Sequence, residues 1–283
     1  MMCFRTCAGI DIERDTELFE RIFDDLMITV NNILRSHSLF LSLDGNGHSM
    51  LIRTTDKYYF FSFLPQIAHI NIGRNINTGQ MTDIFVTEFG RINTLVNNAG
   101  YFPLQRPSDV ITAEEFRHVL DTNLVAYFIG IRAALPYLRK TRGSVINIGS
   151  VVGTMGDEGS AAYSATKGAI QTMTRTIATD EGAYGVRINE VKPGHINTDM
   201  FRKTTSQQAD MKGFVDYSDT LQWLGRGGTS AEIASAVMFL ASDWASFITG
   251  AYIHVTGGYE IGEGPKRKNP FLADWTDMQK IAD

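Results

Sequence analysis

The segment from Tyr163 to Lys167 places a phenol and a primary amine four residues apart. On an α-helix, residues i and i+4 share one face, so these two side chains can act together. A phenol has an ordinary pKa of about 10 and is a weak base at neutral pH, but a neighbouring ammonium group lowers that pKa. The pair therefore predicts a general acid/base that exchanges a proton with a substrate oxygen. A solvated helix with an extended lysine is the alternative that this motif alone leaves open.

Two further polar residues are candidates for a role in catalysis. Ser150 follows a predicted strand over residues 145–148, and its hydroxyl can hydrogen-bond a substrate oxygen as charge develops there. Asn123 lies inside a predicted helix, where a side-chain amide competes with the backbone hydrogen bonds. For Asn123, the alternative is a helix irregularity without a function.

Turn-forming residues follow two other predicted strands. The run Asn97-Asn98-Ala99-Gly100 comes after residues 94–96, and Pro193-Gly194 comes after residues 186–191. Ligands of open α/β sheets bind beyond the carboxyl ends of the strands, so both runs are candidate binding loops. Each is equally compatible with a plain turn.

Helices and short apolar strands alternate after residue 79. Thr112 and Thr229 are each followed three residues later by a glutamate, which predicts two capping boxes at helix starts. Alternation with apolar strands predicts an α/β fold, in which helices cover both faces of a parallel sheet. The predicted helices cover residues 80–89, from 112 onward, 163–181 and 229–241, and the predicted strands 94–96, 145–148, 186–191 and 252–255.

The N-terminal part has a different pattern. Apolar residues recur with helical spacing over 15–37, which predicts an amphipathic helix. The apolar runs 38–43, 49–54 and 58–64 are separated by short turns and predict antiparallel strands. The sequence is therefore divided into three parts: a divergent segment over 1–79, a core over 80–265 and a C-terminal tail over 266–283.

Composition limits the function classes. The net charge of −5 gives no basic surface for nucleic acid, so no nucleic-acid partner is expected. The most apolar run, residues 58–64, is too short to span a bilayer. Cys3 and Cys7 are the only cysteines and complete no metal-ligand pattern, so we expect no metal site and a reducing, cytoplasmic location.

Taken in this order and spacing, the motifs resemble the short-chain dehydrogenase/reductase family. The resemblance implies a Rossmann-like, doubly wound parallel sheet and an NAD(P)-dependent oxidoreductase that interconverts a secondary alcohol and a carbonyl. Tyr163 would be the acid/base, and Lys167 would lower its pKa and hold the nicotinamide ribose. Ser150 would orient the substrate oxygen, and Asn123 would position a relay water.

The resemblance also assigns binding residues and partners. Residues 199–224 would form a lid, and Tyr101, Phe102 and 152–158 would form pocket walls. A homotetramer and a small alcohol or carbonyl substrate are implied. The predicted cofactor-binding residues are Asn97, Asn98, Ala99, Gly100, Tyr163, Lys167, Pro193, Gly194, Ile196 and Thr198.

Longer strings narrow the branch of the family. The stretches 134–140, 184–189 and 255–262 are similar to members described as hydroxysteroid, retinal and L-fucose dehydrogenases. That similarity favours NAD as the cofactor without excluding NADP. It implies a steroid-like, retinoid-like or sugar-like alcohol as the substrate.

The resemblance ends in the N-terminal segment. Family members begin with a strand, a Thr-Gly-x-x-x-Gly-x-Gly turn and a helix, and this run is missing from residues 1–79. We therefore predict that a divergent helix and antiparallel strands replace the first βαβ cofactor half. The alternatives are a segment from another exon or a faulty gene model, and a non-catalytic homologue, deficient in cofactor binding, that acts as a scaffold or oligomer partner.

Overall fold

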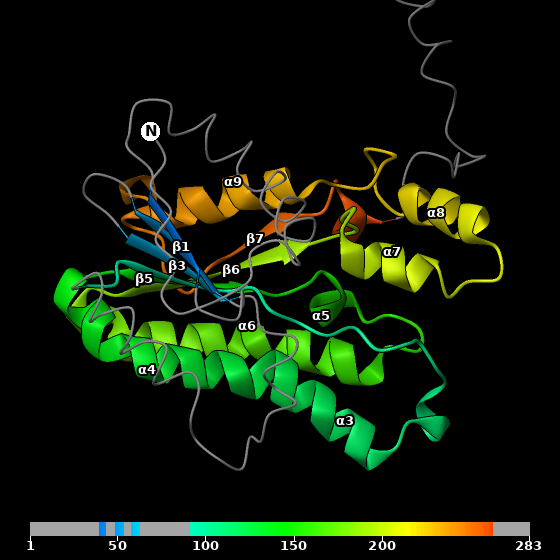
Figure 1. Cartoon of the computed structure of the whole chain (residues 1–283), viewed down its shortest axis with the longest axis horizontal. Coiled ribbons are helices and arrows are strands. Elements are labelled where there is room, and N and C mark those ends of the chain that lie inside the picture. Colours follow the sequence, from blue (N-terminus) through cyan, green and yellow to red (C-terminus); the bar gives the residue numbers. More distant parts are fainter. Residues whose placement is uncertain (1–39, 44–48, 54–57, 63–90, 263–283) are drawn as a thin grey trace, which may run out of the picture.

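The computed structural model describes residues 91–262 together with three short strands that precede them (Figure 1). Seven strands form one sheet in the order β1-β2-β3-β4-β5-β6-β7. The strands are β1 (Phe40–Leu43), β2 (Ser49–Arg53), β3 (Tyr58–Ser62), β4 (Thr94–Asn97), β5 (Ser144–Ile148), β6 (Arg187–Pro193) and β7 (Tyr252–Val255).

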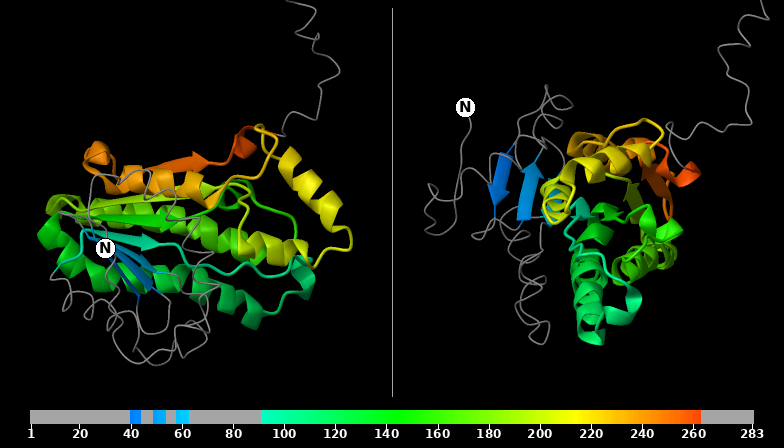
Figure 2. Two further views of the ribbon diagram at one scale, coloured as in Figure 1. Left: turned by 45° about the horizontal axis from the view of Figure 1, so that its top comes forward. Right: turned by 90° about the vertical axis from the view of Figure 1, so that its right-hand side faces the viewer.

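Strands β4 to β7 are parallel and lie between two layers of helices, with β4, β5 and β6 buried and the edge strand β7 partly exposed, which confirms the predicted α/β class (Figures 1 and 2). One face is covered by α4 (Ala126–Thr141) and α6 (Ala161–Glu181), and the other by α9 (Ser230–Ala241). Alternate strand residues supply the two cores: Leu95, Val145 and Ile188 pack with α4, and Val96, Ile146 and Val191 pack with α9.

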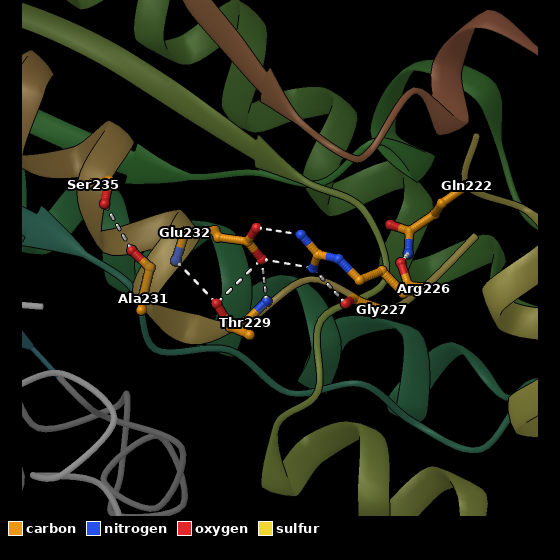
Figure 3. Close-up of polar contacts among 7 residues, drawn as sticks. All are labelled: Gln222, Arg226, Gly227, Thr229, Ala231, Glu232 and Ser235. Atoms are coloured by element: carbon orange, nitrogen blue, oxygen red, sulfur yellow. Dashed lines mark hydrogen bonds and ion pairs between the residues drawn. The ribbon is translucent and has the colours of Figure 1, made fainter. Parts of the chain in front are cut away.

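Both predicted capping boxes are present. Thr112 caps α3 (Ala113–Leu120) with Glu115 at the third position, and Thr229 caps α9 with Glu232. Glu232 also forms an ion pair with Arg226, 2.7 Å between Oε1 and Nη2 (Figure 3). The hydrogen bonds from Arg226 and from the Thr229 backbone lower the pKa of Glu232 to about 2. This pair anchors the segment that leads from the cavity into α9.

Helix α6 begins at Ala161, two residues before the predicted start at Tyr163. No capping signal marks the true beginning, because the hydroxyl of Ser160 donates to Asp157 Oδ2 at 2.9 Å and leaves the first turn uncapped. The three short helices at the carboxyl ends of the strands are α5 (Val152–Met155), α7 (Asp199–Thr205) and α8 (Met211–Thr220).

Strand β1 pairs antiparallel with β2, and β2 pairs antiparallel with β3. Strand β3 also pairs parallel with β4 and so joins the three antiparallel strands to the parallel part of the sheet. The helices predicted over 15–37 and 80–89, and the C-terminal tail, lie outside the described residues. The replacement of the family's first βαβ half by this segment therefore stays a prediction. In the part of the chain that is described, no helix is long and apolar enough to cross a bilayer.

Candidate active site

A cavity of about 990 Å³ opens at the carboxyl ends of the parallel strands. Its lining brings together loops that follow β4, β5 and β6 and one face of α6, which the sequence separates by up to a hundred residues. The predicted site residues that line it are Asn98, Ala99, Gly100, Ser150, Tyr163, Lys167, Pro193, Gly194, Ile196 and Thr198.

The Tyr163 ring packs edge-on against the Phe102 ring, with ring centroids 4.7 Å apart and an angle of 88° between the ring planes. Burial raises the pKa of Tyr163 to about 12, although a hydrogen bond from Ser150 acts in the opposite direction. The expectation that Lys167 lowers this pKa is therefore corrected for the protein without a ligand. Burial outweighs the other effects, and the Lys167 ammonium lies 5.5 Å from the Tyr163 ring centroid.

Lys167 is almost completely buried, and its Nζ donates to the carbonyl oxygen of Ile148 at 2.8 Å. Burial lowers the pKa of Lys167 to about 8, and the charge of Glu190 counteracts this shift. A lysine with that pKa is mainly an ammonium ion at neutral pH. The hydrogen bond to Ile148 fixes it at the end of β5, directly beside the strand exit that carries Ser150.

The position of α6 depends on a close contact with α5. A Cβ atom at Gly153 would lie 2.5 Å from the carbonyl carbon of Lys167 and 2.7 Å from the Gly168 nitrogen. Real Cβ atoms do not approach backbone so closely. Glycine at position 153 therefore lets α5 pack directly on the helix turn that carries Lys167.

We expect Gly153→Ala to push α5 away from α6 and to lower the free energy of unfolding by about 1–3 kcal/mol. Chemical denaturation measures this loss. Gly182→Ala is the matched control, because Gly182 has a helical φ of −57° and nothing within 4 Å of an added Cβ. The control should change stability by less than about 1 kcal/mol. Equal stabilities for the two variants would contradict the packing argument.

Asn123 lies in a π-helical turn over Asp121–Val125 that interrupts the path from α3 to α4. Its Oδ1 accepts from the Tyr101 nitrogen at 2.7 Å, and its Nδ2 donates to the Tyr101 oxygen at 2.8 Å. The fully buried amide thus clamps the loop after Gly100 and does not line the cavity. In this structure Asn123 is a positioning residue, and its predicted contact with a relay water stays a prediction.

Two predicted contacts are placed elsewhere. Asn97 is not among the lining residues, because its Nδ2 donates to Asn147 Oδ1 at 2.8 Å inside the protein. Asn147 in turn donates to Thr174 at 3.0 Å, so Asn97 ties β4 to β5 and α6 rather than facing a cofactor. Tyr101, predicted as a pocket wall, turns its ring onto His118 at 5.5 Å and likewise does not line the cavity.

Helices α7 and α8 cover the far side of the cavity, where residues 199–224 were predicted to form a lid. The lining side chains that they contribute combine apolar and aromatic residues with polar and charged ones: Asp199, Met200, Phe201, Arg202, Thr204, Phe214, Tyr217 and Ser218. His195 packs edge-on against Phe201, 4.1 Å between ring centroids, and burial lowers its pKa. His195 lines the cavity and was not predicted, although it directly follows the candidate loop Pro193-Gly194.

The cavity fits the nicotinamide end of a dinucleotide. Backbone of Gly100 reaches the floor of the site, where an added Cβ would lie 3.5 Å from Asn123 Oδ1 and 3.7 Å from Lys167 Nζ. Lys167 and the loop residues Asn98, Ile196 and Thr198 are the polar and apolar groups that would hold it. Within the described ranges, no three His, Cys, Asp or Glu side chains gather as a metal site.

Comparisons with known proteins agree with this site. The family profile described as enoyl-(acyl carrier protein) reductase matches residues 63–260. L-fucose dehydrogenase of Rattus norvegicus is 40% identical over 189 residues, which cover 67% of this chain and 70% of that relative. Cyclopentanol dehydrogenase of Comamonas testosteroni is 34% identical over 192 residues, which cover 68% and 75%.

A solved structure shares the fold. Ligand-free aldohexose dehydrogenase of Thermoplasma acidophilum superposes with a TM-score of 0.63 at 32% identity, and the match covers 70% of this chain and 76% of that one. The aligned relatives are oxidoreductases of alcohols and carbonyls. With Ser150, Tyr163 and Lys167 at one cavity and a family profile over most of the core, this chain belongs to the short-chain dehydrogenase/reductase family.

Proposed function

We propose that the protein is an NAD(P)-dependent oxidoreductase that interconverts a secondary alcohol and a carbonyl compound, with Tyr163 as its acid/base. One observation carries the proposal: Ser150 and Tyr163 line the same cavity, together with the buried ammonium group of Lys167. The dehydrogenase relatives support the same reaction class.

The residues divide the work as follows. A bound nicotinamide would supply the hydride acceptor or donor, and Lys167 and the loop after β4 would hold its ribose end. Tyr163 is protonated at neutral pH, since its pKa is about 12 before substrate binds, and so it is ready to donate a proton to a carbonyl oxygen. Ser150 hydrogen-bonds the same oxygen and stabilises the charge that develops on it.

In the oxidative direction Tyr163 must first lose its proton. The hydrogen bond from Ser150 favours the phenolate, which then accepts the proton of the substrate hydroxyl. Phe102, Phe201 and Phe214 form an apolar part of the cavity wall beside this exchange.

The substrate is proposed to be a ring-shaped secondary alcohol, sugar-like or carbocyclic. The cavity wall is largely apolar, and polar groups of Gln105, Asp157 and Tyr217 stand among the lining residues. Such a wall suits a ring with an apolar face and several hydroxyls. L-fucose dehydrogenase, cyclopentanol dehydrogenase and aldohexose dehydrogenase are named for substrates of this shape. Hydroxysteroids and retinoids, implied by the sequence resemblance, form the competing class.

The direct test is turnover of a small panel by the purified chain. L-fucose, cyclopentanol, a hydroxysteroid and retinol are each supplied with NAD and with NADP at millimolar concentration, and reduced nicotinamide is followed by its absorbance. We expect NAD-linked oxidation of at least one ring alcohol, abolished in a Ser150→Ala, Tyr163→Phe double variant. Turnover of none of the panel, or turnover that the double variant retains, would contradict the proposal. NAD preference and a cytoplasmic location are parts of the proposal that rest on the resemblance and on the low cysteine content.

We also propose a homotetramer. Strand β7 is an edge of the sheet, and Trp244 and Phe247, in the loop before it, are 87% and 103% exposed. Exposed aromatic side chains beside an unpaired strand favour association with another copy. Light scattering is expected to give about four times the chain mass of 31.5 kDa. Phe247→Glu should reduce that mass, and a monomeric parent at micromolar concentration would rule the assembly out.

A further inference from the structure

Strand β6 carries a carboxylate in the interior of the protein. Glu190 is 0% exposed, and neither of its carboxylate oxygens has a hydrogen-bond partner among the described residues. A methyl group at Gly149 would overlap Glu190 Oε1, so the carboxylate lies against the backbone that immediately precedes Ser150. A buried charge without partners is costly, and such groups are retained where a neighbouring charge uses them.

Positive charges surround this carboxylate. Lys167 and Arg175 of α6 and Lys192 of β6 all act on it electrostatically. Lys192 directs its ammonium group elsewhere, to Thr154 Oγ1 at 2.6 Å and Gln171 Oε1 at 2.7 Å. Arg175 lies over the Tyr252 ring, 5.6 Å from its centroid.

Lys167 is the cation of this group that reaches the cavity. One of the three N–H donors of Lys167 bonds to the Ile148 carbonyl. Burial lowers the pKa of Lys167, and the charge of Glu190 acts against that shift. The other titratable groups that face the carboxylate are Tyr127 of α4, whose pKa burial raises, and Tyr252 of β7 with His254 next to it. Lys167 Nζ and Glu190 Oε1 therefore lie against the same stretch of backbone, Ile148–Gly149, without a direct ion pair between them.

We propose that Glu190 is a positioning residue for the reaction: its carboxylate keeps Lys167 in the ammonium form and so sets the alkaline limit of activity. The inference rests on the proposed role of Lys167. It adds a residue behind the site, on a neighbouring strand, that touches neither substrate nor cofactor.

The directions of the two shifts support this coupling. Burial raises the pKa of Glu190 to about 7, with Lys192 and Lys167 acting against that rise, and burial lowers the pKa of Lys167 to about 8. Both groups are therefore charged together between about pH 7 and pH 8. Because the charges interact, the two groups titrate as a pair, and removing one charge must move the other titration.

The first test does not require activity. The titration of Lys167 is followed by NMR in protein containing isotope-labelled lysine, with the resonance assigned by its loss in Lys167→Met. In Glu190→Gln the midpoint is expected to fall by about one pH unit or more, because a nearby opposite charge is lost. An unchanged midpoint would overturn the proposal.

Glu181→Gln is the matched control. Glu181 is also a buried glutamate, but it lies at the far end of α6, where Arg139 donates to it at 2.6 and 2.7 Å. Removing this carboxylate should leave the Lys167 midpoint unchanged. A shift of equal size in both variants would mean a general loss of structure and would also overturn the proposal.

Thermal unfolding against pH gives a second readout. The folded-state pKa of Glu190 is raised, so the stability that its protonation contributes is present below pH 4.5 and is lost as the pH rises to about 7. The melting temperature of Glu190→Gln relative to the parent is therefore expected to rise across that window. A constant difference would show that Glu190 does not titrate there. Glu190→Met, of similar length, replaces the glutamine variant if the latter does not fold.

The catalytic readout is the pH profile of kcat/KM for the best alcohol substrate. Its alkaline limb is expected to move down by about one unit in Glu190→Gln and to stay in place in Glu181→Gln. If the NMR midpoint moves while no variant or parent shows turnover, the coupling stands and the proposed enzymatic function fails. If turnover is present and neither the limb nor the midpoint moves, Glu190 is only structural.

Discussion

Replacing Tyr163 by phenylalanine is expected to reduce turnover of a secondary alcohol by about 10²–10⁴-fold. The variant keeps the ring that packs at 4.7 Å on Phe102, so the shape of the cavity should survive. It removes the hydroxyl group of Tyr163, which lines the cavity and is proposed to exchange a proton with the substrate oxygen. The loss should appear in kcat, with little change in the KM of the alcohol.

Tyr127→Phe is the control for removing a buried phenol near Lys167. The Tyr127 ring lies 5.6 Å from the Lys167 ammonium, almost the same distance as Tyr163, yet Tyr127 does not line the cavity. Its hydroxyl donates only a long hydrogen bond of 3.4 Å to Ile148. We expect a far smaller loss of turnover than for Tyr163→Phe. Similar losses in the two variants, or a Tyr163→Phe variant within twofold of the parent, would remove Tyr163 from the acid/base role.

Local patterns were sufficient for most elements of the parallel half. Strand β7 matches its predicted range, and both helices with a Thr-x-x-Glu signal start where that signal places them. Each of these features depends on neighbours within four residues along the chain. The start of α6 was missed because Ser160 bonds to Asp157 instead of capping the helix. The π-helical turn at Asn123 could be suspected from the amide but not assigned.

The pKa shifts and the side chains that reach the cavity depend on contacts between residues far apart in the chain, which the sequence does not show. The motif at Tyr163 correctly indicated one helix face, yet the direction of its pKa shift depends on how much of the protein covers the phenol. Asn97 and Asn98 are adjacent in sequence, but Asn97 is the last residue of β4 and bonds to Asn147 inside the protein, whereas Asn98 lies just beyond the strand and reaches the cavity. Glu190 and Lys192 read as polar interruptions of a strand until the fold places them beside Lys167 and Gln171.

The second large effect concerns the affinity for the cofactor. No Thr-Gly-x-x-x-Gly-x-Gly run precedes β4 in this sequence, and in family members that run brings backbone N–H groups to the pyrophosphate. A charge-assisted hydrogen bond to phosphate is worth about 1.5–3 kcal/mol, or roughly ten- to a hundredfold in affinity. Several such bonds depend on one turn. We therefore expect this chain to bind NADH far more weakly than a family member that has the glycine turn.

Comparing the affinities for NADH and for reduced nicotinamide mononucleotide tests whether the weak binding arises at the pyrophosphate end of the site. The residues proposed to hold the nicotinamide end, Lys167, Asn98 and Thr198, all line the cavity, so reduced nicotinamide mononucleotide should bind almost as tightly as NADH. In an intact site the pyrophosphate and adenosine add affinity, and the dinucleotide binds much better than the mononucleotide. Fluorescence titration of the full chain measures both dissociation constants, and Lys167→Met should weaken both ligands together. Micromolar or tighter binding of NADH, or a preference of more than about a hundredfold for NADH over the mononucleotide, would show that a pyrophosphate site exists despite the missing glycines.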